Sequence, residues 1–417
     1  MNEGSRNSPA PMLQQGTMSI VLRAMGLAIG PVVAIGFSRF AYALLLPPMK
    51  ADLAWSFTQA GAINTANAAG YIIGALAAGL FARLLGAARA FLAGIAISAI
   101  TLLAMATGAD FALLTLVRLV SGTANAVTFV IGAALAGSLA HRDSGAAGIP
   151  IGVYIGGAGA GIALSGFIVP MALELGDAGW RLGWLALGIA GLAACAPAML
   201  AARAVEASVN GAAARLRWAE IRQIWPTIAA YGLFGAGYVS YMTFVISLLR
   251  AQGNSASEAN LFWIVLGVAA AFSPVIWSRW LARMPAGPGG AAVYLATAAG
   301  ALLPLVFAGR MAVFASAILF GGSFLSASAA ITIASKDQLP MKSLTAALAL
   351  LTVAFAIGQT LGPVTSGAIT DMVGGISSGL WISPALLLLA AMIALLQPAA
   401  VAGIHGRDLG SMPARKG

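Results

Sequence analysis

The sequence predicts an all-α polytopic membrane protein with twelve transmembrane helices in two pseudo-symmetric six-helix bundles. Three observations support this fold class: an apolar composition, apolar runs of spanning length between short polar breaks, and residues that match at a constant offset. Of the 417 residues, 60% are hydrophobic and only 8% are charged, and the mean hydropathy is +0.93. These values indicate a membrane protein, because soluble domains contain far more charged residues.

Each apolar run is long enough to cross a bilayer as an α-helix, which takes about 20 residues. The breaks between the runs contain Gly, Pro, Asn and Asp, which are typical of turns. We expect spans at about 20–47, 57–81, 88–107, 111–138, 146–171, 181–202, 224–249, 257–281, 290–308, 312–334, 343–370 and 378–398. Transmembrane strands would alternate in polarity over about ten residues, and no stretch of the sequence does so.

The distribution of Lys and Arg predicts the orientation of these spans. With a cytoplasmic N-terminus, 16 of the 22 Lys and Arg residues fall in inner segments, four in outer segments and two within spans. This asymmetry follows the positive-inside rule, so we expect both termini in the cytoplasm. The net charge of +10 therefore reflects topology, and the scattered basic residues argue against a nucleic-acid partner.

A polar stretch in the middle of the chain separates six spans from six. We expect a cytoplasmic linker at 203–222 between halves at 20–202 and 223–402, with cytoplasmic extensions at 1–19 and 403–417. At an offset of 201 residues the halves match at Gly36 and Gly237, Gly157 and Gly358, Gly161 and Gly362, Ser165-Gly166 and Ser366-Gly367, and Trp180 and Trp381. A constant offset indicates duplication, and an even number of spans per half makes the repeats parallel.

Twelve spans in two parallel halves resemble the major facilitator superfamily, and this resemblance covers almost the whole chain. Arg118-Leu-Val-Ser-Gly122 is similar to the family's Arg-x-x-x-Gly pattern in the fourth span, and Tyr154 to Gly161 is similar to its glycine-rich fifth helix. Arg83 departs from the pattern, because the family usually has an acidic residue at this place in the loop between spans two and three.

At a finer level, the segments Gly36 to Met49 and Asn67 to Gly74 resemble the YbfB/YjiJ-type branch of bacterial permeases. The resemblance implies a monomeric secondary transporter in the bacterial cytoplasmic (inner) membrane. It also implies alternating access, in which the two halves rock about a central cavity lined by spans one, four, seven and ten.

Arg39 and Arg118 lie well within spans, where a charge costs several kcal/mol unless it faces protein or water. Both lie roughly 12 Å below the outer surface at 1.5 Å per residue, and the resemblance implies that both face the central cavity. Two planar, permanently charged guanidinium groups suit a carboxylate or a phosphate group. The alternative is that one or both arginines bind backbone carbonyls or Asn side chains and only hold helices together.

Other polar residues of the spans are candidate ligands of the substrate. They are Tyr42, Asn67, Tyr71, Asn125, Tyr154, Tyr238, Tyr241, Thr243 and Gln359. At the repeat offset Ser240 replaces Arg39, so the first half carries the charge and the second half carries hydroxyl and aromatic groups. Such a site would orient a solute with an anionic end and an apolar or hydroxylated end. The alternative for many of these residues is an interhelical hydrogen bond, worth about 0.6 kcal/mol.

Two further sets of residues are candidates for roles in conformational change. Gly157, Gly161, Gly358 and Gly362 form two GxxxG spacings, which predict close helix packing; the resemblance supports movement of the halves past each other at these positions. No Asp or Glu falls clearly within a span, so proton co-transport or counter-transport lacks an obvious carrier. Asp110 and Asp371 near outer ends are the remaining candidates for coupling or gating, and the alternative is an ordinary helix-end charge.

Motifs for chemistry are absent from the sequence. No cluster of His and Cys suits a metal ion, and no glycine-rich loop carries the Gly-Lys-Ser/Thr of ATP-binding proteins. We therefore expect no metal, no cofactor and no enzymatic activity, and predict a permease for a small organic solute, preferably an anion. The alternative is a multidrug or sugar-type efflux permease whose arginines are structural.

Overall fold

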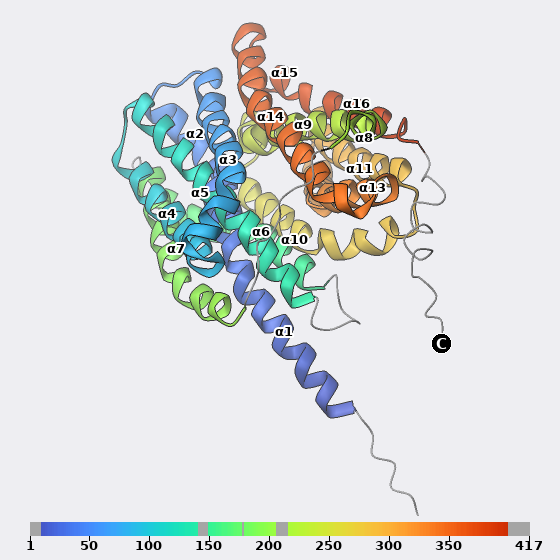
Figure 1. Cartoon of the computed structure of the whole chain (residues 1–417). Helices are drawn as coiled ribbons and strands as arrows, with labels where there is room; N and C mark the ends of the chain where they lie inside the picture. The colour runs from blue at the N-terminus through green and yellow to red at the C-terminus, as the bar shows by residue number, and fades with distance from the viewer. Residues whose placement is uncertain (1–9, 141–148, 177–178, 206–215, 399–417) are drawn as a thin grey trace, which may run out of the picture.

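The computed structural model describes residues 10–140, 149–176, 179–205 and 216–398. All regular elements of these residues are helices, and 12 helical segments among them are long and apolar enough to cross a membrane. The prediction of a twelve-span helical protein is therefore confirmed. Figure 1 shows two bundles side by side, the first running from blue to green and the second from yellow-green to red.

The first bundle holds spans one to six. Its helices are α1 (Ala10–Pro31), η1 (Val32–Phe40), α2 (Tyr42–Asp52), α3 (Phe57–Leu85), α4 (Ala87–Thr107), α5 (Phe111–Ala140), α6 (Ile149–Leu173) and α7 (Gly179–Arg203). The first three of these together form the first span. The element η1 is a π-helix, with backbone hydrogen bonds one residue longer than those of an α-helix.

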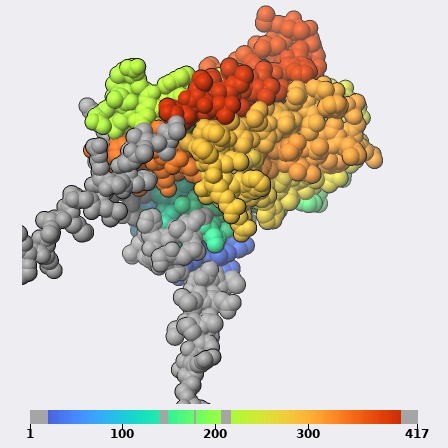
Figure 2. Space-filling model, turned by 90° about the vertical axis from the view of Figure 1, so that its right-hand side faces the viewer, coloured from blue at the N-terminus to red at the C-terminus, as the bar shows by residue number. Residues whose placement is uncertain are grey.

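The second bundle holds spans seven to twelve. Its helices are α8 (Trp218–Gln223), α9 (Trp225–Ala251), α10 (Ala256–Leu281), α11 (Ala286–Val306), α12 (Arg310–Phe324), α13 (Ala327–Gln338), α14 (Met341–Val373), α15 (Ile376–Leu380) and α16 (Ile382–Ala394). The pairs α12–α13 and α15–α16 each form one span. This bundle makes up the upper part of the face seen in Figure 2, above blue and teal surfaces of the first bundle.

The observed spans begin and end close to the predicted limits, and the first span differs most. The sequence predicts a break at Pro47 and Pro48, but the helix α2 continues through both prolines to Asp52. Membrane-spanning helices tolerate proline more often than soluble helices do, so a proline pair is a weaker boundary signal here. At its other end the span begins at Ile20, as predicted, and the helix α1 continues back to Ala10, out of the bundle (Figure 1).

The predicted linker lies only partly within the described residues. Within it, the short helix α8 is held against the second bundle by Glu220. This side chain accepts hydrogen bonds from the backbone N–H of Arg217 (2.8 Å) and from the hydroxyl of Ser343 at the start of α14 (2.8 Å). The hydrogen bond from the Arg217 N–H lowers the pKa of the Glu220 carboxyl most, and the hydrogen bond from Ser343 lowers it further. The carboxylate thus remains charged while it anchors α8.

The internal repeat appears as equivalent helix contacts in the two bundles. In the first bundle α6 packs against α1 and η1, and in the second α14 packs against α9. Gly157, Gly161, Gly358 and Gly362 lie at these two contacts, each directly against the backbone of the partner helix. A side chain at any of the four would overlap that backbone, so these glycines allow close packing inside each bundle.

Different glycines form the boundary between the bundles, which meet along the pairs α6–α10 and α3–α14. Gly159 of α6 lies against the backbone of Ala271, and Gly267 of α10 lies against the backbone of α6. Gly61 of α3 and Gly367 of α14 meet the opposite helix in the same way. Close backbone contacts between the two bundles therefore occur at these glycines, and not at the two GxxxG pairs singled out in the sequence.

Hydrogen bonds between the bundles gather toward one end of the molecule, here termed the Asp371 end. Asp371 of α14 accepts hydrogen bonds from the backbone N–H groups of Phe57 (3.0 Å) and Thr58 (2.8 Å) and from the Thr58 hydroxyl (2.6 Å). These N–H groups begin α3 and have no partner inside that helix, so a carboxylate there is favoured by hydrogen bonding and by the helix dipole. The other such bonds among the described residues join Asn64 to Thr243, Thr65 to Thr360, and Trp263 to Ser165.

Candidate substrate cavity

A cavity of about 90 Å³ lies between the two bundles. Its walls come from η1, α3, α5 and α6 of the first bundle and from α9, the α12–α13 segment and α14 of the second. Half of the residues that line it are aromatic, and Arg39 is the one charged residue among them. The α-helical pattern is broken at two of these walls, by the π-helix η1 and by the turn between α12 and α13. Such irregular backbone is often found at functional sites.

Arg39 lies in η1 and is only 4% exposed. Its guanidinium makes no hydrogen bond or ion pair with any of the described residues, and its buried Nε atom has no partner. The guanidinium carbon lies 5.4 Å from the ring centre of Tyr71 and 6.0 Å from that of Phe40. Ring faces stabilise a cation only in part, so this buried guanidinium is suited to bind an anion that enters the cavity.

The second bundle contributes a wall of nearly parallel aromatic rings to the cavity. Tyr231 and Phe355 stack with their ring centres 4.4 Å apart, and Phe355 and Tyr238 follow at 5.5 Å with only 3° between their planes. Phe234 stacks on Tyr238 at 5.4 Å. The spacing of residues 231, 234 and 238 places all three on one face of α9. This wall is apolar except for the phenol hydroxyl groups.

Gln359 adds an amide to the same wall. Its side-chain nitrogen donates a hydrogen bond to the hydroxyl of Tyr238. The amide oxygen is buried and has no partner among the described residues. The cavity therefore offers a polar group on the second bundle in addition to the cation on the first.

Arg118 does not line the cavity, in contrast to the prediction that both arginines face one space. It is fully buried and donates hydrogen bonds to the carbonyl oxygen of Ser38 and to the side-chain oxygen of Asn64 (3.1 Å). Its guanidinium also lies 5.1 Å from the ring centre of Tyr42. This is the arrangement of the structural alternative, in which backbone carbonyls and Asn side chains satisfy the arginine.

Two of the predicted ligands, Asn67 and Asn125, belong to a buried network around Ser38. The Ser38 hydroxyl lies 2.6 Å from that of Ser121 and accepts a hydrogen bond from Asn125 (3.0 Å). Asn67 donates a hydrogen bond to the carbonyl oxygen of Arg118 (3.3 Å). These bonds connect η1, α3 and α5 directly behind Arg39, so the network fixes the backbone that carries the cavity cation.

The remaining predicted ligands divide into two groups. Tyr71, Tyr238 and Gln359 line the cavity together with Arg39. Three of the others bind neighbouring helices through their hydroxyls: Tyr42 binds the carbonyl of Ala60, Tyr154 those of Thr128 and Phe129, and Tyr241 the hydroxyl of Ser316. The Thr243 hydroxyl donates to the carbonyl of Val239 in its own helix, α9, and accepts a hydrogen bond from Asn64 of α3. The sequence pattern did not distinguish these two groups.

The sequence pattern also did not single out the aromatic residues of the cavity. Phe40, Phe129, Phe234, Phe324 and Phe355 all line it. Each lies in a span that is apolar on every side, so periodicity does not separate a cavity-facing phenylalanine from a lipid-facing one. Which phenylalanines lie beside Arg39 and Tyr238 becomes known only when the arrangement of the helices in space is known.

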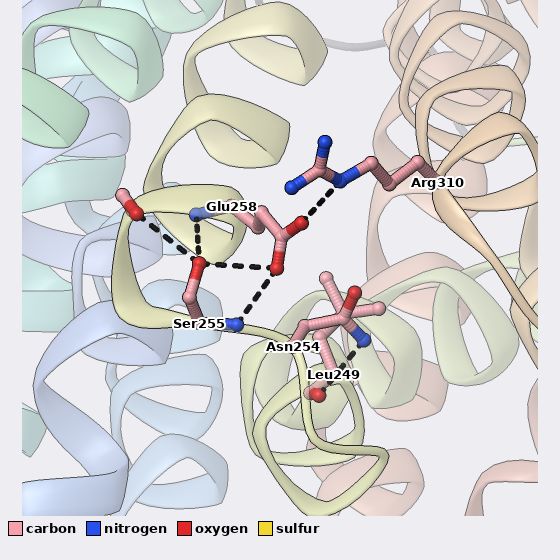
Figure 3. Close-up of polar contacts among 6 residues, drawn as sticks. Leu249, Asn254, Ser255, Glu258 and Arg310 are labelled. Carbon is pink, nitrogen blue, oxygen red and sulfur yellow. Dashed lines mark hydrogen bonds and ion pairs between the residues drawn. The ribbon is translucent and has the colours of Figure 1, made fainter.

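Three acidic residues near the span ends, Asp110, Glu258 and Asp371, already have partners. Asp110 accepts a hydrogen bond from the backbone N–H of Leu113 (2.8 Å) and thus caps its own helix, α5. Figure 3 shows Glu258 at the start of α10, where its carboxylate binds Arg310 and accepts a hydrogen bond from the Ser255 N–H (2.9 Å). Among these carboxylates, Asp371 is the one that connects the two bundles.

Comparison with known proteins agrees with this architecture. A family model described as "Uncharacterised MFS-type transporter YbfB" matches residues 31–395. A bacterial homologue of the human lysosomal transporter Spinster, in an inward-facing and occupied conformation, has a similar structure, with a TM-score of 0.72 and 16% identity, covering 93% of this chain and 98% of that chain. The nucleoside transporter NupG has a TM-score of 0.64 and 15% identity, covering 91% and 97%. No curated protein matches the chain.

Proposed function

This chain belongs to the YbfB-type transporters of the major facilitator superfamily, and from that membership we propose that it carries a small organic anion across the bacterial cytoplasmic membrane. The observation that supports an anion is Arg39, a buried cation at the cavity that has no anionic partner among the described residues. Leaving a charge buried without a partner is costly, so its retention favours a ligand that supplies the opposite charge.

The alternative of an efflux permease with structural arginines fits Arg118 but not Arg39. Arg118 is bound by Ser38 and Asn64 within its own bundle. Arg39 has no such bonds among the described residues and lies at the cavity. A cationic drug is further disfavoured, because the described residues that line the cavity include no acidic side chain. We therefore assign substrate binding to Arg39 with Tyr71, Tyr238 and Gln359, and a positioning role to Arg118, Asn67 and Asn125.

Transport by alternating access is supported by the distribution of contacts between the bundles. The described hydrogen bonds between them lie toward the Asp371 end. The positive-inside distribution places this end on the periplasmic side. The arrangement then corresponds to a state closed toward the outside, as in the inward-facing Spinster homologue. We assign to Asp371 the role of a gate that opens when the bundles rock outward, and to Asp110 that of a helix cap.

An uptake screen in proteoliposomes tests the proposed function. Purified wild-type protein and the Arg39→Gln variant are compared for uptake of small carboxylates, phosphate esters, sugars and nucleosides, the last because NupG transports nucleosides. We expect saturable uptake of an anion by the wild type and its loss in the variant. Arg279→Gln, which changes an exposed arginine, is the matched control. A neutral or cationic preferred substrate, or undiminished uptake by Arg39→Gln, would refute the proposal.

A further inference from the structure

Resting on the proposed function, we propose that the transported anion is a small aromatic carboxylate with a single planar ring. The cavity juxtaposes one guanidinium with a wall of nearly parallel aromatic rings. A carboxylate on a flat ring matches both parts at once.

The cation can accept a carboxylate without breaking existing bonds. Arg39 makes no hydrogen bond with the described residues, and Tyr71 and Phe40 already lie against its guanidinium. A guanidinium presents paired N–H groups in a planar fork, and a carboxylate fills that fork with two parallel hydrogen bonds. The backbone that carries this fork is held in place, because Arg118 binds the carbonyl oxygen of the preceding residue, Ser38.

The aromatic wall favours a planar apolar body. Tyr238 is nearly parallel to Phe355 (3°) and to Phe324 (17°), with ring centres 5.5 and 5.8 Å away. A flat ring can continue this stacked arrangement, and each such aromatic pair is favourable beyond the area that it buries. A saturated ring of the same size is thicker and has no π system, so it gains only the buried area.

The size and the polarity of the cavity exclude larger and more polar anions. A volume of about 90 Å³ is below the roughly 150 Å³ of an engineered cavity that binds benzene, so a guest of two or more rings is excluded and a one-ring guest requires the lining to move apart. Sugar phosphates and nucleotides need many hydrogen-bond partners, and a polar group that is buried without one is costly. The described lining supplies only the polar groups of Arg39, Gln359, Ser328 and three tyrosines, Tyr71, Tyr231 and Tyr238, and its other side chains are those of phenylalanine, leucine, isoleucine and alanine.

Three matched probes test this inference by equilibrium titration of the purified protein in nanodiscs. Benzoate has the ring and the charge, cyclohexanecarboxylate has the charge without the planar ring, and benzamide has the ring without the charge. We expect benzoate to bind about five- to tenfold more tightly than cyclohexanecarboxylate and benzamide to bind most weakly. Arg39→Gln should weaken benzoate binding by about tenfold or more.

Variants of the wall link the selectivity to this cavity. Phe355→Leu should reduce the preference for benzoate over cyclohexanecarboxylate to about twofold or less. Phe272→Leu is the matched control, because Phe272 is 61% exposed on α10 and lies outside the cavity lining. Tyr231→Leu removes the neighbouring ring and serves as the second variant if Phe355→Leu unfolds at a lower temperature than the wild type.

The outcomes distinguish the two proposals. Equal binding of benzoate and cyclohexanecarboxylate, with both lost in Arg39→Gln, overturns the aromatic inference and leaves the anion proposal intact. Tighter binding of benzamide than of benzoate overturns both. A preference for benzoate that persists in both Phe355→Leu and Tyr231→Leu overturns the assignment of selectivity to this wall. The assignment also fails if none of the three probes binds saturably.

Discussion

Arg118 donates a hydrogen bond to the carbonyl oxygen of Ser38, the residue that directly precedes Arg39 in the π-helix η1. The sequence places the two arginines at the same depth in the membrane, and this contact shows how differently they are used. Arg118 is satisfied by the protein itself, whereas Arg39 is left without a hydrogen bond among the described residues. One arginine thus fixes the backbone from which the other reaches the cavity.

Replacing Arg39 should affect transport much more than stability. Arg39→Gln should raise KM for the anion by about ten- to a hundredfold, because a charge-assisted hydrogen bond is worth about 1.5–3 kcal/mol. Arg39→Lys should recover part of this loss, since it keeps the charge but not the planar fork. Uptake kinetics in proteoliposomes and thermal unfolding measure the two effects. A large drop in Tm with Arg39→Gln would contradict a role in binding alone.

Replacing Arg118 should affect stability more than transport. Arg118→Met removes the donor to the Ser38 carbonyl and to Asn64, and a buried acceptor left unpaired costs about 1–3 kcal/mol. We expect a clear loss of unfolding free energy and, because η1 moves, weaker anion binding as a secondary effect. The matched control is Arg39→Met, which removes no hydrogen bond among the described residues. Equal Tm values for the two variants would argue against this difference in role.

The depth of the two arginines could be predicted from the sequence, but the direction of their side chains could not. The length of an apolar run fixes where a residue lies along the membrane normal. Rotation of a span about its own axis is set by packing, and in a first span that is apolar on nearly all sides no stripe of residues reports it. The π-helix adds one residue to a turn and so changes the direction of Arg39 relative to any regular periodicity.

The glycine repeat could be predicted as close packing, but the partner helix could not. Gly157 and Gly159 are two residues apart on α6, and one faces its own bundle while the other faces the opposite bundle. In the sequence both are small residues of a glycine-rich helix, and nothing in the pattern distinguishes them. Only the placement of α1 and α10 on opposite sides of α6 distinguishes a glycine inside a bundle from one at the boundary.

Removing the carboxylate of Asp371 should loosen the Asp371 end. Asp371→Ala deletes three hydrogen bonds to the start of α3, at a cost of about 1–2 kcal/mol. The population that is open at this end should therefore rise by roughly tenfold. Spin labels at Thr107 and Met372, both exposed at this end, report the distance between the bundles in a Cys195→Ser background.

The matched control for this experiment is Asp110→Ala at the same end of the molecule. Asp110 caps α5 through Leu113 in its own bundle, so its loss should weaken that helix start without separating the bundles. Distance distributions that are the same for Asp371→Ala and the wild type would rule out Asp371 as a gate. A similar widening in both variants would point to general destabilisation.

A single methyl group at the boundary of the bundles should impair transport. In Gly159→Ala the new Cβ would overlap the backbone of Ala271, so α6 and α10 must move apart. We expect a lower Tm and a several-fold lower uptake rate. In Gly152→Ala, on the same helix, the Cβ meets no neighbour. The higher helix propensity of Ala should leave the free energy of unfolding unchanged or raise it by up to about 1 kcal/mol, so Tm should not fall. Equal behaviour of the two variants would count against a tight boundary.

The glycine contacts between the bundles also bear on how fast the protein can work. Where Gly61, Gly159, Gly267 and Gly367 meet the opposite helix, bare backbone replaces interlocking side chains. Sliding along such a contact requires no rotamer change, so it adds little activation enthalpy. In the proposed alternating-access cycle we therefore expect the barrier to turnover to come mainly from the polar bonds of the Asp371 end, and the temperature dependence of transport should report the breaking of those bonds.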